Sequence, residues 1–163
     1  MHEYPYNHTP GNLPPTMTKI PFFNAINDQA LDEVLGRSSL LDCDAGDVII
    51  EEGSLDKDLF VLLKGQVRIE KDGELVAGIG QQGELLGELA LISEEGRSAS
   101  VVAASRVYCL KIAGANLQDL SEADRNAYYA AVYRFLSRLL AERLEKTTTK
   151  LAAAEEQLRQ IKS

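Results

Sequence analysis

The chain has 163 residues, 45% of them hydrophobic and 26% charged, which is typical of a globular domain with one core. Its formal net charge of −8 argues against a general nucleic-acid surface, and no apolar run approaches the ~20 residues of a membrane span. Cys43 and Cys109 are too few for a disulfide framework or a zinc site. We therefore expect buried, reduced thiols and, with no signal-peptide core at the N-terminus, a cytoplasmic location.

Residues 1–19 are predicted to form a flexible leader. They show little hydrophobic periodicity and contain four of the five prolines, Pro5, Pro10, Pro14 and Pro15. A helix should follow, because Asn27 or Asp28 can cap a segment that carries apolar residues on one face and ends near Gly36. The domain proper is thus expected to begin at residue 20.

Residues 40–112 carry the pattern of short strands. Strand-like apolar runs occupy segments such as 59–63 and 67–69, and glycine-containing turns separate them. With the N-terminal helix, this predicts a domain over residues 20–120. The predicted fold class is α+β, an antiparallel β jelly-roll barrel with a short helix, an N-terminal helix and a long C-terminal helix.

A long helix is predicted over residues 121–163. Ser121 and Asp124 resemble a capping box, and no proline or glycine follows them. At 1.5 Å per residue this helix would be roughly 60 Å long, more than one small domain can cover. Its heptad seam predicts a coiled-coil homodimer through Leu140, Leu144, Thr147, Leu151, Ala154, Leu158 and Ile161. A solvated helical tail and a linker to a further domain remain open.

The most informative motif is Gly87-Glu88-Leu89-Ala90-Leu91, followed by Arg97-Ser98-Ala99-Ser100. Free amides at a helix start can point at a phosphate, and an arginine fork matches two phosphate oxygens. The carboxylate of Glu88 can accept from a ribose hydroxyl. Simpler interpretations exist for each residue: Arg97 could be a surface arginine paired with Glu94 or Glu95, and Glu88 could merely favour a helix start.

At these residues the sequence resembles the cyclic-nucleotide-binding domain family, in the phosphate-binding cassette that defines it. The family's glycine turns and early strands are also matched, so the resemblance covers roughly residues 20–148. It departs from the commonest pattern at Leu86 and Gly96, and neither change removes a ligand group. The resemblance implies that Arg97 pairs with the cyclic phosphate and that Glu88 takes the ribose 2′-hydroxyl. It implies further ligand contacts from Gly87, Leu89, Ala90, Ser98 and Ala99.

Within the family, the long helix resembles that of the catabolite-activator branch of bacterial cyclic-AMP receptors. This implies that Arg143 and Leu144 lie at the nucleotide, and that Thr147 bonds the base of its own subunit. Thr148 would then reach the base held by the partner. Alternatively, Thr147 only fills a polar seam position and Thr148 is exposed. Spacing alone suggests Val67 and Ala77 as apolar walls for the base.

The sequence contains no nucleophile–base pair, catalytic acid pair or metal-ligand cluster. We therefore expect no enzyme activity and no metal. The predicted function is a regulatory sensor of a cyclic purine mononucleotide, with cyclic AMP expected and cyclic GMP as the alternative. The dimeric C-terminal helix would transmit the signal, with no nucleic acid or membrane as partner. Two other functions stay open: a nucleotide-free interaction module that uses the coiled coil, and the sensor of a longer effector enzyme.

Overall fold

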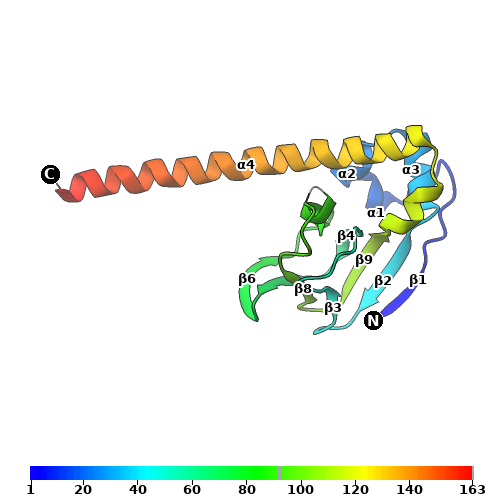
Figure 1. Cartoon of the computed structure of the whole chain (residues 1–163), viewed down its shortest axis with the longest axis horizontal. Helices are drawn as coiled ribbons and strands as arrows, with labels where there is room; N and C mark the ends of the chain where they lie inside the picture. The colour runs from blue at the N-terminus through cyan, green and yellow to red at the C-terminus, as the bar shows by residue number, and fades with distance from the viewer. Residues whose placement is uncertain (92, 163) are drawn as a thin grey trace.

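The computed structural model describes residues 1–91 and 93–162 and confirms an α+β jelly roll (Figure 1). All strand pairs are antiparallel. One sheet has the order β1 (His2–Pro5), β2 (Ser39–Cys43), β9 (Val107–Ile112), β4 (Leu59–Lys64) and β7 (Leu85–Leu86). The other has the order β3 (Val48–Ile50), β8 (Ser100–Ala103), β5 (Val67–Lys71) and β6 (Glu74–Ile79).

Inward-facing side chains of both sheets form the core of the jelly roll. β4 and β9 lie in the interior of the first sheet and are buried along most of their length, because one face of each packs in this core and the other packs under the helices. Cys43 and Cys109 are both free thiols in this core, as predicted. Burial raises the pKa of Cys43 to about 11 and that of Cys109 to about 12, so neither thiol is reactive at neutral pH.

Helices pack on one end of the jelly roll. The N-terminal ones are α1 (Pro15–Thr18), α2 (Pro21–Asn24) and α3 (Asp28–Leu35). The N-cap of α3 is Asn27, whose side chain accepts from the Ala30 amide at 2.9 Å. The remaining helical segments are the 3-10 turns η1 (Glu88–Leu91) and η2 (Gly114–Asp119) and the long helix α4 (Glu122–Lys162).

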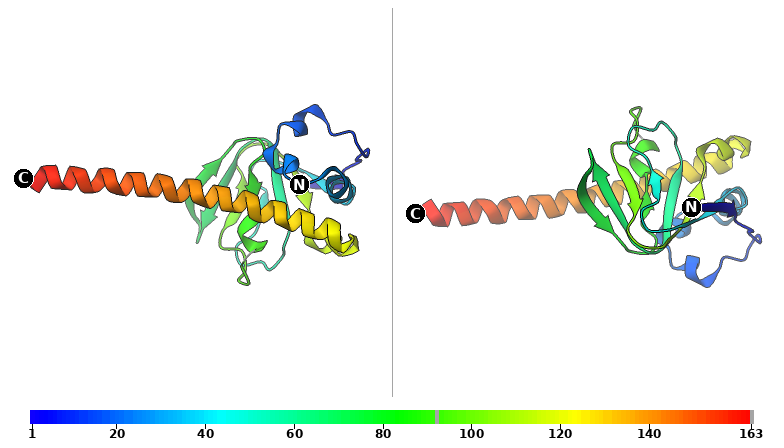
Figure 2. Two further views of the ribbon diagram at one scale, coloured as in Figure 1. Left: turned by 90° about the horizontal axis from the view of Figure 1, so that it is seen from above. Right: turned by 90° about the horizontal axis from the view of Figure 1, so that it is seen from below.

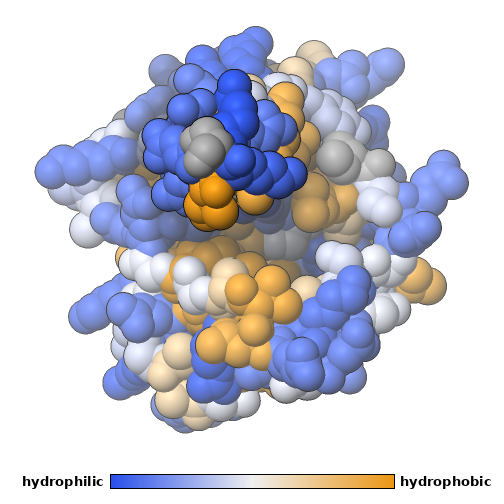
Figure 3. Space-filling model, turned by 90° about the vertical axis from the view of Figure 1, so that its left-hand side faces the viewer, coloured by the Kyte–Doolittle hydropathy of each residue, from blue (hydrophilic) through white to orange (hydrophobic). Residues whose placement is uncertain are grey.

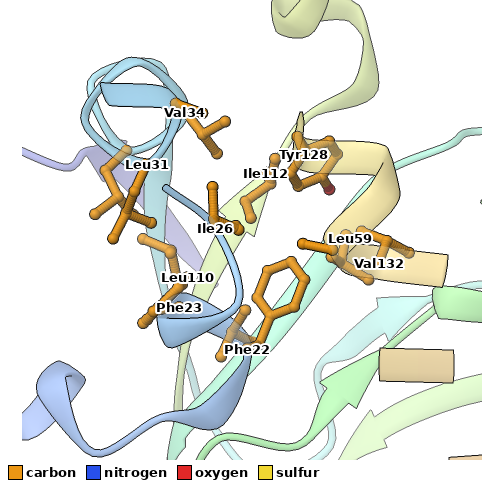
Figure 4. Close-up of a cluster of buried hydrophobic side chains, with 14 of the residues drawn as sticks. Phe22, Phe23, Ile26, Leu31, Val34, Leu59, Leu110, Ile112, Tyr128 and Val132 are labelled. Atoms are coloured by element: carbon orange, nitrogen blue, oxygen red, sulfur yellow. The ribbon is translucent and has the colours of Figure 1, made fainter. Parts of the chain in front are cut away.

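The first turns of α4 belong to the domain core. Tyr128, Val132 and Leu136 are buried against α2, α3 and the strands, and Figure 4 shows side chains from these elements converging. The Phe22 ring meets the Tyr128 ring edge-on at 6.2 Å. Leu136 is the last buried residue of α4. The next turns still border the pocket at the barrel, and only the outer part of the helix extends beyond the barrel (Figure 2). The predicted helix end at Ser163 lies outside the described residues.

The structure differs from the prediction of a flexible leader at residues 1–19. His2–Pro5 form the edge strand β1, paired with β2. His8 Nε2 lies 2.7 Å from Asp32 Oδ1, and Met17 is buried. The prolines permit this because Pro5 ends an edge strand and Pro15 opens α1, and both positions tolerate a missing N–H. Among the described residues, no helix is long and apolar enough to cross a membrane.

Candidate functional site

A pocket of about 840 Å³ lies between the barrel and α4. Figure 3 looks onto the C-terminal end of α4 and shows hydrophobic surface on the barrel beside the helix. The floor of the pocket is apolar, with Ile50, Ile69, Ile79 and Val101 from the second sheet. All the predicted cassette residues border it, namely Gly87, Glu88, Leu89, Ala90, Arg97, Ser98 and Ala99.

Gly87 sets the turn that starts the cassette. Its φ of +83° lies in the left-handed region, and a Cβ there would collide with the Arg97 guanidinium and crowd Ile50. The carbonyl oxygen of Gly87 accepts from Arg97 Nη1 at 2.6 Å. Glycine is therefore required both by the backbone conformation and by the close approach of Arg97.

Arg97 is buried, and its side chain is 3% exposed. Its guanidinium pairs with the carboxylate of Asp56 and also donates from Nη2 to the Asp58 carbonyl oxygen at 2.6 Å. The alternative of a surface arginine paired with Glu94 or Glu95 is therefore wrong. The guanidinium borders the pocket, but most of its donors already have protein partners.

Asp56 is the partner that sequence reasoning missed. It precedes Arg97 by 41 positions and lies in the loop between β3 and β4, so no local spacing signals the pair. Burial by itself would raise the pKa of the Asp56 carboxyl. Hydrogen bonds from Arg97 and from the Asp58 amide outweigh it and lower that pKa to about 2. The Asp56 carboxyl is thus fully ionised at neutral pH.

Glu88 is half-buried and interacts electrostatically with Arg97. Burial raises the pKa of Glu88, and the nearby charges of Arg143 and Arg97 oppose this while Glu84 adds to it. Glu84 also has a raised pKa because of burial, opposed by Arg143. Two acids and two arginines therefore meet around the polar side of the pocket. The carboxylates can accept hydrogen bonds from hydroxyl groups, and the guanidinium groups can bind an anion.

The long helix presents one face to this pocket. The α4 residues on this face follow helical spacing and are Phe135, Leu139, Glu142, Arg143 and Lys146. Of the helix residues predicted from the resemblance, Arg143 is at the pocket. Leu144, Thr147 and Thr148 do not border it, because they lie on other faces of the helix. Leu144 is 68% exposed, and Thr148 Oγ1 donates to the Leu144 carbonyl oxygen at 2.8 Å.

The two strand residues suggested as walls for the base also lie elsewhere. Val67 is buried in the sandwich core, and Ala77 is exposed on β6. Ile69 and Ile79 border the pocket instead. Spacing along the sequence identifies the β5–β6 hairpin, but it does not show which of its side chains are buried in the core and which border the pocket. Across residues 1–91 and 93–162, no group of three or more His, Cys, Asp or Glu residues could hold a metal ion.

The jelly roll, the cassette and the pocket against a following helix define a cyclic-nucleotide-binding regulatory domain. The family model of the cyclic nucleotide-binding domain matches residues 40–124, more than half of the chain. The chain belongs to this family. It is similar to the cAMP-activated global transcriptional regulator Vfr of Pseudomonas aeruginosa, with 33% identity over 129 residues, 74% of this chain and 58% of Vfr.

Two further relatives share this domain. Human cGMP-dependent protein kinase 2 is 38% identical over 88 residues, 46% of this chain and 11% of the kinase. The crystal structure of the Thermus thermophilus catabolite activator protein is similar with a TM-score of 0.60 and 26% identity, covering 83% of this chain and 63% of that one. The chain thus spans only part of each of these longer relatives.

Proposed function

We propose that this chain senses a purine 3′,5′-cyclic mononucleotide, with cyclic AMP as the first candidate, in the pocket between the cassette and α4. The observation that carries the proposal is the convergence of Arg97, Glu88 and the cassette backbone on one pocket with an apolar floor. Arg97 and the amides of Leu89 and Ala90 would hold the phosphate. Glu88 would accept from the ribose hydroxyl, and the isoleucines would contact the base.

Arg97 needs only a limited change to take a phosphate. Four of its donor contacts go to Asp56, Gly87 and Asp58, and a guanidinium carries five N–H groups. The phosphate can use the remaining donor, or it can replace Asp56 as the anionic partner. In the second case binding would release the loop that carries Asp56, which links occupancy of the pocket to a movement outside it.

The choice between cyclic AMP and cyclic GMP depends on residues beyond the cassette. Vfr is described as cAMP-activated and kinase 2 as cGMP-dependent. The threonines that the resemblance assigns to the base do not border this chain's own pocket. Thr148 therefore has a role at the base only if a second chain presents it. Ser98, which follows Arg97, could hydrogen-bond the amino group of guanine.

A thermal-shift titration tests the proposal. A ligand at ~100 times its dissociation constant stabilises the folded state by about 2.7 kcal/mol. We expect this stabilisation with cyclic AMP or cyclic GMP and none with 5′-AMP, whose phosphate is not cyclised. No shift with either cyclic nucleotide would contradict the proposal and would favour an interaction module that uses only α4.

We also propose that α4 forms a parallel coiled coil with a second copy. Its outer half has an exposed apolar seam, with Leu144, Leu151 and Leu158 at 68%, 59% and 51% exposure. In a parallel pair, Lys150 would face Glu155 of the second copy at the flanking positions, where opposite charges favour this orientation. The dimer would carry the binding signal along α4 to an output domain or partner.

A further inference from the structure

Lys57 contacts the cassette but does not border the ligand pocket. It lies in the loop between β3 and β4. Its Nζ donates to the carbonyl oxygen of Ala90 at 2.6 Å and to that of Ser93 at 2.7 Å. Carbonyls at the end of a helical turn lack partners within the turn. The ammonium group therefore satisfies two oxygens that would otherwise need water.

The residues on both sides of Lys57 hold the other end of the cassette. Asp56 pairs with the guanidinium of Arg97, and the Asp58 carbonyl accepts from it. Two backbone hydrogen bonds of 2.8 Å join the same loop to Arg97. The Gly53 amide donates to the Arg97 carbonyl oxygen, and the Arg97 amide donates to the Ser54 carbonyl oxygen. One loop, residues 53–58, thus fixes both η1 and Arg97.

This loop also touches the segment that leads into α4. The Gly114 amide donates to Asp58 Oδ1 at 3.0 Å. A Cβ on Gly114 would lie 3.0 Å from the Lys57 carbonyl oxygen, so the two backbones pass close to each other. Gly114 opens η2, and α4 begins at Glu122. The loop therefore connects the cassette with the beginning of the long helix.

We propose that Lys57 is a positioning residue for ligand binding. By holding the end of η1, it fixes the Leu89 and Ala90 amides relative to Arg97, which the neighbouring Asp56 holds. Its effect passes through η1, because its ammonium group is bonded to the Ala90 and Ser93 carbonyls and Lys57 does not border the pocket. The inference rests on the proposed function, since it concerns the affinity of that site.

The test compares three variants of the full chain. Lys57→Met keeps the aliphatic stem and removes the donor, whereas Lys57→Arg keeps a cationic donor. Lys64→Met removes the same charge at the exposed end of β4 and serves as the control. We expect Lys57→Met to bind the cyclic nucleotide about tenfold more weakly, which is about 1.4 kcal/mol. Lys64→Met should bind as the wild type does, and Lys57→Arg should recover most of the loss.

Hydrogen–deuterium exchange of the ligand-free proteins gives the second readout. Peptides that cover residues 86–97 should exchange faster in Lys57→Met, while peptides from β4 and β9 should not change. Unchanged affinity in Lys57→Met would overturn the inference, as would an equal loss in Lys64→Met. The inference would also be overturned if Lys57→Met exchanged faster across the whole molecule and Lys57→Arg did not return the exchange to the wild-type rate. If the wild type binds neither nucleotide, the proposed function fails, while the exchange comparison still decides whether Lys57 holds the cassette.

Discussion

The ion pair between Asp56 and Arg97 links the binding residue to a loop outside the pocket. Arg97 is buried, while the Asp56 side chain is 40% exposed. The carboxylate keeps the guanidinium partnered when no phosphate is present. The same carboxylate weakens the binding of a phosphate, because it competes with the phosphate for Arg97 and repels its negative charge. Asp56 should therefore stabilise the ligand-free fold at the expense of affinity.

Asp56→Asn tests this competition. The amide retains a hydrogen-bonding oxygen but loses the charge, and Arg97 still has the Gly87 and Asp58 carbonyls. We expect cyclic nucleotide to bind a few-fold more tightly and the ligand-free protein to lose about 1–2 kcal/mol of stability, a modest loss since Asp56 is partly exposed. Calorimetric titration and urea unfolding measure the two quantities. Weaker binding would instead mean that Asp56 mainly positions Arg97.

Acid unfolding should report the same pair. The pKa of Asp56 is about 2 in the folded protein and near 3.8 when unperturbed. A lowered pKa contributes stability that is present above 3.8 and lost as the pH falls toward 2. The wild type should therefore lose more stability than Asp56→Asn between pH 4 and pH 2, measured by urea unfolding. Parallel curves for the two proteins would contradict this.

Glu88 should make nucleotide binding pH-dependent. Burial raises the pKa of its carboxyl above the usual 4.5, so it takes up a proton at a higher pH than an exposed glutamate. The protonated acid accepts a ribose hydroxyl less well than the carboxylate. Affinity should thus fall as the pH is lowered from neutral into the acid range, and the fall should begin at a higher pH than an exposed glutamate would give, as measured by titration. Glu88→Gln should bind more weakly at pH 7 and show little of this dependence; an equal dependence in both proteins would refute the assignment.

At the scale of elements, the sequence predicts features that depend on neighbouring residues, but it does not predict contacts between distant segments. Asn27 caps α3, and the Ser121 hydroxyl accepts from the Asp124 amide, because both caps depend on neighbouring residues. The cassette follows a contiguous motif, and its predicted residues all border one pocket. The Asp56 partner of Arg97 and the pairing of β1 with β2 join distant segments. Nothing local in the sequence encodes such contacts.

The face that α4 presents to the pocket is a similar case. The heptad pattern identified the apolar seam at Leu144 and Leu151, but not which other side faces the barrel. That side is set by where Tyr128 and Val132 are anchored in the core. One residue of offset turns a helix by about 100°. Lys146 therefore borders the pocket whereas Thr147 does not.

Leu151→Asp tests the seam. A charge at the centre of the coiled coil should abolish dimers, because it cannot be buried without a partner. Ala152→Asp places the same charge one residue away, outside the seam, and should leave dimers intact. Light scattering coupled to size-exclusion chromatography measures both. A monomeric wild type at ~100 µM, or dimers in both variants, would contradict the parallel coiled coil and leave α4 as a solvated helix.

At the scale of the whole molecule, the barrel forms most of the pocket, and α4 runs from the pocket to the exposed outer end of the helix. The anchored part of α4 ends at Leu136, and the next turns form one side of the pocket. A ligand held between the cassette and these turns contacts both parts at once. It can bias the position of α4 only through a difference in affinity between two helix positions. Binding at the cassette is therefore the claim on which the account depends.

Isothermal titration of cyclic AMP and cyclic GMP into the wild type, Arg97→Ala and Arg106→Ala tests that claim most directly. Arg106 is an exposed arginine that pairs with Asp42 and does not border the pocket, so its loss is a matched control. The account predicts micromolar or tighter binding in the wild type and in Arg106→Ala, and none in Arg97→Ala. Absence of binding in the wild type, or unchanged affinity in Arg97→Ala, would contradict it.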